Sequence, residues 1–176
     1  MVRTVYEGRL VNLRIERVRL PNGRDTELEI MEHRGAAAVA AVDDARRVVL
    51  LHQYRYAASG YLWEVPAGVL DRAGEAPAAC AARELREEAG LAARELRPLG
   101  AIFTTPGFCT ERIHLFLARG LERVEHARED DEVISEVREV ALDEALAMIR
   151  RGEIVDGKTI AALYLAADAL RETAAA

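Results

Sequence analysis

Three carboxylates lie within five residues of one another, at Glu84, Glu87 and Glu88. In a helix, Glu84 and Glu88 would share one face, where like charges four residues apart cost roughly 0.2–0.5 kcal/mol. A hard divalent cation such as Mg²⁺ or Mn²⁺ would offset this repulsion, because it binds carboxylate oxygens and keeps waters and substrate phosphates as its other ligands. The alternative is a solvated charged helix face, since runs of charge are common on helices.

The residues around these carboxylates predict a helix that packs against a sheet. Pro77 is typical of a first helical turn, and Gly90 is typical of a helix end. Arg83 precedes Glu87 by four residues, which is the spacing of a helical ion pair. An apolar helix face is predicted from residues at helical spacing, namely Ala78, Ala82, Leu85 and Ala89.

The rest of the chain shows the apolar patterns of strands, with further helices near the C-terminus. Strands are expected at 10–20, 27–33, 36–42, 47–55, 61–66, 96–105, 112–121 and 136–142. Helices are expected at 77–89, 142–152 and 157–172. This order predicts a mixed α/β sandwich (α+β), with antiparallel strands in residues 1–35 and the main domain in residues 36–176.

Composition narrows the possible functions. The chain has 176 residues, of which 51% are apolar, and its formal net charge is −6. This charge argues against a nucleic-acid partner, because duplex binders usually present a basic surface. The two cysteines form no CxxC pair, which suits a reducing cytosol. The N-terminus and the apolar runs predict neither a signal peptide nor a membrane span, so we expect a cytoplasmic protein.

The segment from Gly68 to Leu91 resembles the nudix box, G-x5-E-x7-R-E-U-x-E-E-x-G-U, in which U is apolar. The matching positions are Glu75, Arg83, Glu84, Leu85, Glu87, Glu88, Gly90 and Leu91. Two departures stand out. Six residues separate Gly68 from Glu75 where the family has five, and Ala76 replaces the usual Ser or Thr N-cap. The extra residue falls in the expected loop, so it leaves the helical phase of the glutamates intact.

This resemblance implies a nudix-type α/β/α sandwich with a mixed sheet, and a hydrolase of nucleoside diphosphate derivatives. Glu84 and Glu88 would be the principal metal ligands, with Glu87 ligating or supporting them. The backbone carbonyl of Ala67 would add another ligand. Arg83 would hold the glutamates in place by salt bridging, and the resemblance implies catalytic roles for Arg83 and Glu87. Glu75 would brace the preceding loop.

Segments outside the box resemble the ADP-ribose pyrophosphatase subfamily. They are HQYRY, LWEVPAG, TTPGFCTERIHLFLA and GEIVDGKTIAAL, and Pro106 lies fifteen residues after Leu91. The resemblance implies Mg²⁺- or Mn²⁺-dependent hydrolysis of ADP-ribose to AMP and ribose 5-phosphate. It also implies a homodimer in which the strands from Val11 to Ile30 contribute to the partner's site. Other nucleotide sugars, dinucleoside polyphosphates, NADH and FAD stay open as substrates.

In this subfamily the general base is a glutamate in a late acidic loop, which here contains the run REDDE. Glu132 is the first choice and Glu129 the second, although solvated charge is the simpler interpretation of the run.

Arg34 and Arg55 would contact phosphate or ribose unless they are ordinary surface arginines. Phe108 would pack near the adenine or else belong to the core. The expected substrate-binding residues are Arg34, Arg55, Glu64, Val69, Pro106, Gly107, Phe108 and Glu111, with Glu64 near the terminal ribose.

Two rival functions stay open. Residues 152–159, GEIVDGKT, fit the P-loop pattern, in which backbone N–H groups and Lys158 would hold phosphates. A P-loop should follow a strand, whereas a helix is expected before Gly152. A nudix-fold binding module without catalysis is the other rival, but it should have lost glutamates from the box, and here all of them are present.

Overall fold

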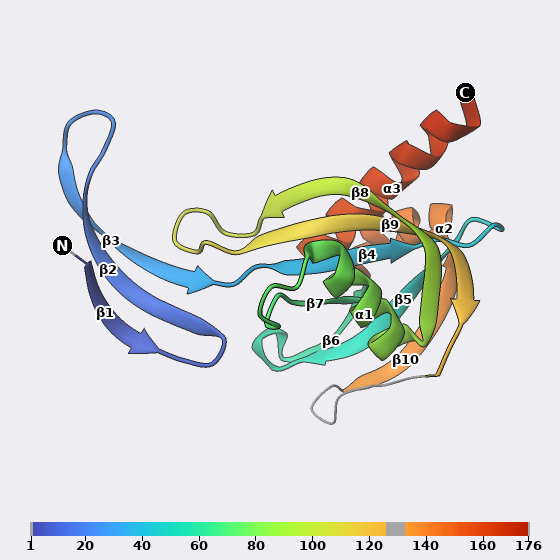
Figure 1. The fold of residues 1–176 in the computed structure, drawn as a ribbon. Coiled ribbons are helices and arrows are strands. Elements are labelled where there is room, and N and C mark those ends of the chain that lie inside the picture. The colour runs from blue at the N-terminus through green and yellow to red at the C-terminus, as the bar shows by residue number, and fades with distance from the viewer. Residues whose placement is uncertain (1, 126–132, 176) are drawn as a thin grey trace.

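The computed structural model describes residues 2–125 and 133–175. Its N-terminal part is an antiparallel three-stranded sheet of β1 (Val2–Glu7), β2 (Val11–Arg19) and β3 (Asp25–His33). Figure 1 shows this sheet standing to one side of the remaining elements, with β3 leading into them. The turn between β2 and β3 contains Gly23 at φ 82°, as the Asn22-Gly23 pair predicts. β1 was not expected, because its exposed, mixed sequence carries little apolar pattern.

Two further sheets form the body of the molecule. The first has the order β7 (Ala67–Val69), β4 (Ala36–Ala41), β9 (Arg112–Arg123) and β8 (Leu91–Phe103). The β4–β9 pair is parallel, whereas β7 and β8 pair antiparallel with their neighbours. The second sheet has the order β10 (Ile134–Ala141), β5 (Arg47–Arg55) and β6 (Gly60–Glu64). A short 3₁₀ turn, η1 (Tyr56–Ala58), connects β5 to β6. The expected mixed sheet is confirmed.

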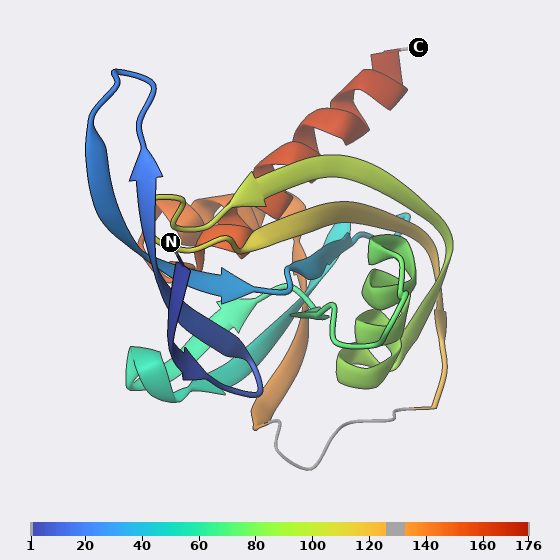
Figure 2. The same ribbon diagram turned by 60° about the vertical axis from the view of Figure 1, so that its left-hand side comes forward.

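Strand β4 is buried on both faces, which is unusual for a strand but typical of a parallel pair covered by helices. Ala36, Ala38 and Ala40 belong to a core shared with α2 (Leu142–Arg150) and α3 (Gly157–Ala175). Ala37, Val39 and Ala41 belong to a core shared with α1 (Pro77–Ala89). The small alanine side chains let helices approach from either side, which gives the α/β/α layers visible in Figures 1 and 2.

Helix α1 carries the glutamates and begins and ends where its sequence predicts. Pro77 occupies the first turn, Ala76 provides no side-chain cap, and Gly90 adopts the left-handed conformation at φ 64°. The Gly90 N–H donates to the Arg86 carbonyl at 3.0 Å, which satisfies a terminal backbone acceptor.

The predicted apolar face of α1 is partly wrong. Leu85 and Ala89 are buried, but Ala78 and Ala82 are exposed. Cys80 and Ala81 are buried in their place. Alanine is a weak marker of burial because its methyl group adds little apolar area, so the alanine spacing misplaced the buried stripe by about one residue.

The P-loop alternative is wrong. Residues 152–159 connect α2 to α3, so a helix and not a strand precedes them. Gly152 adopts φ 74°, and its N–H donates to the Ile149 carbonyl at the end of α2.

In the described residues, no helix combines the length and apolar content needed to cross a bilayer.

The core contact of α1 should be essential for stability. Leu85 is fully buried, so Leu85→Ala should lower the free energy of unfolding by about 2–5 kcal/mol. Arg86→Ala, at the next and exposed position, should change it by less than about 0.5 kcal/mol. Urea unfolding followed by circular dichroism measures both, and equal effects would contradict the described packing.

Candidate active site

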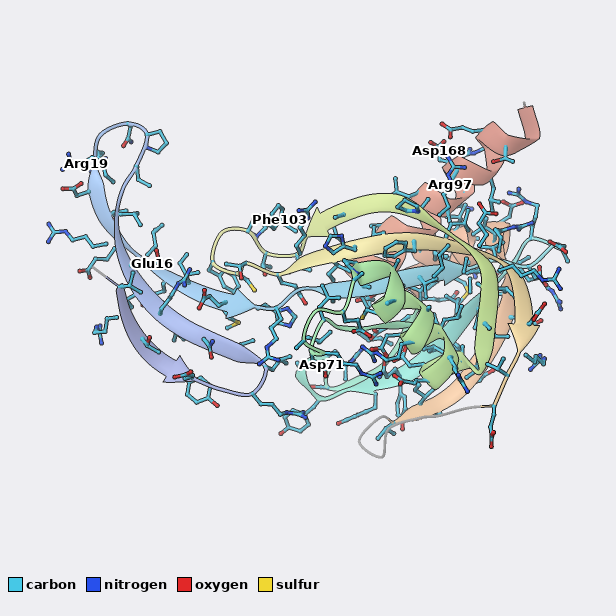
Figure 3. All side chains as sticks on the ribbon, in the orientation of Figure 1. Glu16, Arg19, Asp71, Arg97, Phe103 and Asp168 are labelled. Atoms are coloured by element: carbon cyan, nitrogen blue, oxygen red, sulfur yellow. The ribbon has the colours of Figure 1, made fainter. Side chains whose placement is uncertain are left out.

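An open cavity of about 1140 Å³ brings together residues from distant parts of the chain. Its wall includes residues of α1, β7, β5 and the start of α3, namely Glu84, Glu88, Ala67, Val69, Arg55 and Lys158. Figure 3 labels two other lining residues, Phe103 at the end of β8 and Asp71 in the loop between β7 and α1. Acidic and basic groups therefore face one shared space, which suits a ligand with phosphates.

Glu84 and Glu88 are buried although both are carboxylates, with 5% and 1% of their surface exposed. Glu88 accepts a hydrogen bond from the Ala67 N–H at 2.8 Å. Glu84 packs against Gly68 so closely that a Cβ there would lie 1.8 Å from its Oε1 atom. Strand β7 and helix α1 thus fit together only because residue 68 has no side chain.

Arg83 donates hydrogen bonds to three carboxylates at once. Its Nε donates to Glu75 at 2.9 Å, and its Nη1 donates to Glu87 at 2.8 Å and also to Glu84. The hydrogen bonds with Glu75 raise the pKa of Arg83 and lower the pKa of Glu75. These ion pairs agree with the bracing expected of Arg83 and Glu75.

Glu87 is placed differently from the other two box glutamates. Arg83 binds one of its oxygens and Arg72, from the loop before α1, binds the other at 3.1 Å. It is not among the residues that line the cavity. The geometry therefore favours Glu87 as a support for the other glutamates over a direct metal ligand.

The donor chemistry at Glu84, Glu88 and the Ala67 carbonyl suits a hard divalent cation. In the described part of the chain, no group of three or more His, Cys, Asp and Glu side chains forms a ready metal cage. Such a cage is not required for Mg²⁺, which is usually held by one or two carboxylates together with waters and substrate phosphates. Two buried carboxylates that open onto the cavity fit this pattern.

Arg55 reaches the cavity wall with a buried carboxylate behind it. Its Nε and Nη2 donate to the two oxygens of Glu64, both at 2.8 Å. Glu64 is only 1% exposed and does not line the cavity, so it lies behind Arg55 and its expected contact with the terminal ribose stays a prediction. Burial opposes its ionisation, but hydrogen bonds from Arg55 and the charge of Lys158 outweigh this and lower the pKa of Glu64.

Of the other residues expected to bind substrate, some line the cavity and others do not. Arg34, Val69 and Glu111 line the cavity, and Glu111 accepts a hydrogen bond from the Thr104 hydroxyl at 2.8 Å. Residues 106–108 do not line it. Instead the Phe108 carbonyl accepts from the Met31 N–H at 2.7 Å, so this loop ties β3 to the body. The Phe108 side chain is 52% exposed, which excludes it from the core.

The two candidate bases, Glu132 and Glu129, lie outside the described residues. Val133, which follows them, lines the cavity. The assignment of the base stays a prediction.

Sequence reasoning missed several cavity residues, among them His33, Tyr54, Asp156 and Lys158. Lys158 stands in the GKT run, which is a local signal, but this run fits the P-loop pattern and so predicts phosphate binding in place of an ion pair. Its buried partner, Glu64, lies 94 residues away in the chain. No local pattern reports such a contact.

Known proteins resemble this chain along most of its length. A NUDIX domain model matches residues 31–163. The chain therefore belongs to the Nudix family, which confirms the resemblance seen in the box.

Individual relatives are similar over nearly the whole chain. An ADP-ribose pyrophosphatase of Bacillus subtilis (strain 168) is 40% identical over 160 residues, which cover 90% of this chain and 86% of that protein. A methanol dehydrogenase activator of Bacillus methanolicus is also 40% identical, over 161 residues with the same coverage. The crystal structure of an ADP compounds hydrolase superposes with a TM-score of 0.85 at 21% identity, covering 98% of this chain and 93% of that one. This last likeness confirms the fold.

The contact between Gly68 and Glu84 generates a test. Gly68→Ala should displace the Glu84 carboxylate, because the new Cβ would overlap it, and should weaken Mn²⁺ binding by about tenfold or more. Isothermal titration with Mn²⁺ measures the affinity. Gly60→Ala is the matched control, since its Cβ would meet nothing closer than 4.0 Å. Equal Mn²⁺ affinities in the two variants would remove Glu84 from the metal site.

Proposed function

We propose that the protein hydrolyses the diphosphate of ADP-ribose to AMP and ribose 5-phosphate with a divalent cation, Mg²⁺ or Mn²⁺. The observation that carries this proposal is the pair of buried carboxylates, Glu84 and Glu88, that open onto a cavity with Arg55 in its wall. The 40% identical ADP-ribose pyrophosphatase supports the choice of substrate.

Hydrolysis forms a bond between a water oxygen and one phosphorus, breaks the bridging P–O bond and leaves two phosphate monoesters. Glu84, Glu88 and the Ala67 carbonyl would hold the cation, which when bound would neutralise phosphate charge and acidify a water molecule. Arg83 keeps the carboxylates in position, with Glu87 and Glu75 as its other partners. Arg55 and Arg34 would orient the phosphates, and this positioning makes the attack effectively unimolecular.

Glu132, with Glu129 as the second choice, would accept the proton of the attacking water. A general base of this kind contributes typically about 10²–10⁴-fold to the rate.

The loop between Gly68 and Glu75, which contains the extra residue, contributes Asp71 to the cavity wall. We therefore propose that the extra residue affects substrate fit and leaves the relative positions of Glu84 and Glu88 on α1 unchanged.

Hydrolysis should be tested with a panel of ADP-ribose, GDP-mannose, diadenosine polyphosphate, NADH and FAD, each with Mg²⁺ or Mn²⁺. ADP-ribose should be among the best substrates, and AMP and ribose 5-phosphate should appear in equal amounts by liquid chromatography. Removal of the metal with EDTA should abolish turnover. If another member of the panel is clearly preferred, the substrate proposal is wrong.

The same assay tests the carboxylates. Glu88→Gln keeps the acceptor for the Ala67 N–H but removes the charge, so kcat should fall by about 10²–10³-fold. Glu95→Gln, at an exposed position of β8, is the control and should be unaffected. Full activity of Glu88→Gln would contradict the metal assignment.

We further propose that the chain divides at residue 35, is cytoplasmic and works as a homodimer. Strand β1 exposes Val2, Val5 and Tyr6, each by 48% or more, and Leu10 is 51% exposed. Residues 8–10 also line the cavity, next to this apolar surface. A second copy that covers the N-terminal sheet would remove these side chains from water.

The dimer has its own test. Sedimentation velocity should show a dimer for the unmodified chain and a monomer for Val5→Glu, because a charge buried in the interface is costly. Val155→Glu, at a residue 59% exposed outside the N-terminal sheet, should stay dimeric. A monomeric unmodified chain at micromolar concentration would refute the dimer.

A further inference from the structure

Glu64 is the buried meeting point of two cations from different elements. It ends β6 and is 1% exposed. Arg55 of β5 binds both its oxygens, and Lys158 of α3 binds its Oε2 atom. A buried charge is tolerated only when it is paired and hydrogen-bonded, and here both oxygens have charged partners.

The start of α3 is attached to the residue that follows Glu64. Asp156 Oδ2 accepts hydrogen bonds from the Thr159 N–H at 2.9 Å and from the Thr159 hydroxyl at 2.6 Å. The Thr159 hydroxyl in turn accepts from the Val65 N–H at 3.0 Å, in a fully buried position. Asp156 also lies 3.0 Å from the Lys158 ammonium. The first turn of α3 thus holds Lys158 at one place against β6.

Arg55 has donors left for the cavity. The pair with Glu64 uses its Nε and Nη2 atoms, and a guanidinium has five N–H groups, so three remain. Its side chain is 40% exposed, compared with 12% for Lys158 and 1% for Glu64. Exposure therefore falls from Arg55, in the wall, to Glu64, behind it.

We propose that Glu64 and Lys158 are positioning residues that hold the Arg55 guanidinium ready for a phosphate in the cavity. The proposal rests on the proposed function. Glu64 fixes the plane of the guanidinium through two parallel hydrogen bonds, which is the geometry that orients arginine best. Lys158 keeps Glu64 ionised and in place, because its positive charge opposes the effect of burial on that carboxylate. A flexible arginine would have to lose its rotamer freedom when the substrate binds, whereas a fixed one does not.

Lysine is rare in this chain, because Lys158 is the one lysine among the 24 lysine and arginine residues. Its compact ammonium carries three donors on a flexible stem, and here it lies within reach of both Glu64 and Asp156. An arginine would present a wide planar fork in a space where its side chain is 12% exposed. The GKT run therefore has a function unrelated to a P-loop.

Steady-state kinetics with ADP-ribose test the proposal. Glu64→Gln and Lys158→Met should each raise KM by about tenfold, the value of one charge-assisted hydrogen bond, and should change kcat much less, as loss of substrate binding predicts. Lys158→Arg keeps the charge and should restore part of the KM. In an Arg55→Ala background, Lys158→Met should have no further effect on KM, because the residue that it positions is gone.

A purely structural role would give a different result. In that case Lys158→Met would lower the melting temperature but leave the KM of the folded enzyme unchanged, and the Arg55→Ala background would make no difference. Either result overturns the proposal. Failure of the proposed function is separate, since it appears as an unmodified chain that does not hydrolyse ADP-ribose. The same comparison of variants is then made with the best substrate of the panel.

The single lysine also allows a direct measurement. Selective ¹³C labelling of lysine gives one side-chain Cε signal in the nuclear magnetic resonance spectrum, that of Lys158. Arg55→Ala should shift this signal, because it removes the other cation bound to Glu64. Arg34→Ala is the matched control, since Arg34 also lines the cavity but contacts the Asp71 carbonyl instead. An unchanged signal in Arg55→Ala would show that the two cations are not coupled and would overturn the proposal.

Discussion

The site depends on confining several like-charged carboxylates in a small buried volume, and Arg83 is the group that makes this possible. Glu84 and Glu88 are almost fully buried on α1. Without a cation, their repulsion and the loss of hydration would oppose this arrangement. Arg83 contacts Glu75, Glu84 and Glu87, and the Ala67 N–H supports Glu88. The fold thus stabilises the carboxylates before a metal and a substrate add their own charges.

A second part of the cavity wall follows the same principle with the signs reversed. There a buried carboxylate, Glu64, holds the cations Arg55 and Lys158. In both places, charged groups that line the cavity are held by partners of opposite charge. Such pairs have limited value for stability, since desolvation offsets much of their attraction. Their value here lies in fixed geometry, which a reaction between bound groups requires.

The sequence predicted the elements with strong local signals. Pro77 and Gly90 marked the ends of α1, and the apolar run 36–41 marked a buried strand. The sequence failed where the local signal was weak or misleading. The helical spacing of Ala78 and Ala82 predicts burial, but both are exposed, because alanine is found on buried and exposed helix faces alike. Strand β1 was missed because it buries no face of its own.

The sequence by itself determined the Nudix family and the phase of the carboxylates on one helix, because both are properties of neighbouring residues. Only the tertiary structure decided which charged groups meet. It brought Lys158 to Glu64, placed Glu64 behind Arg55, and set Glu84 against Gly68. It also gave residues 106–108 a structural contact with β3. These contacts join residues far apart in the chain, and the packing of helices on both faces of the sheet selects them.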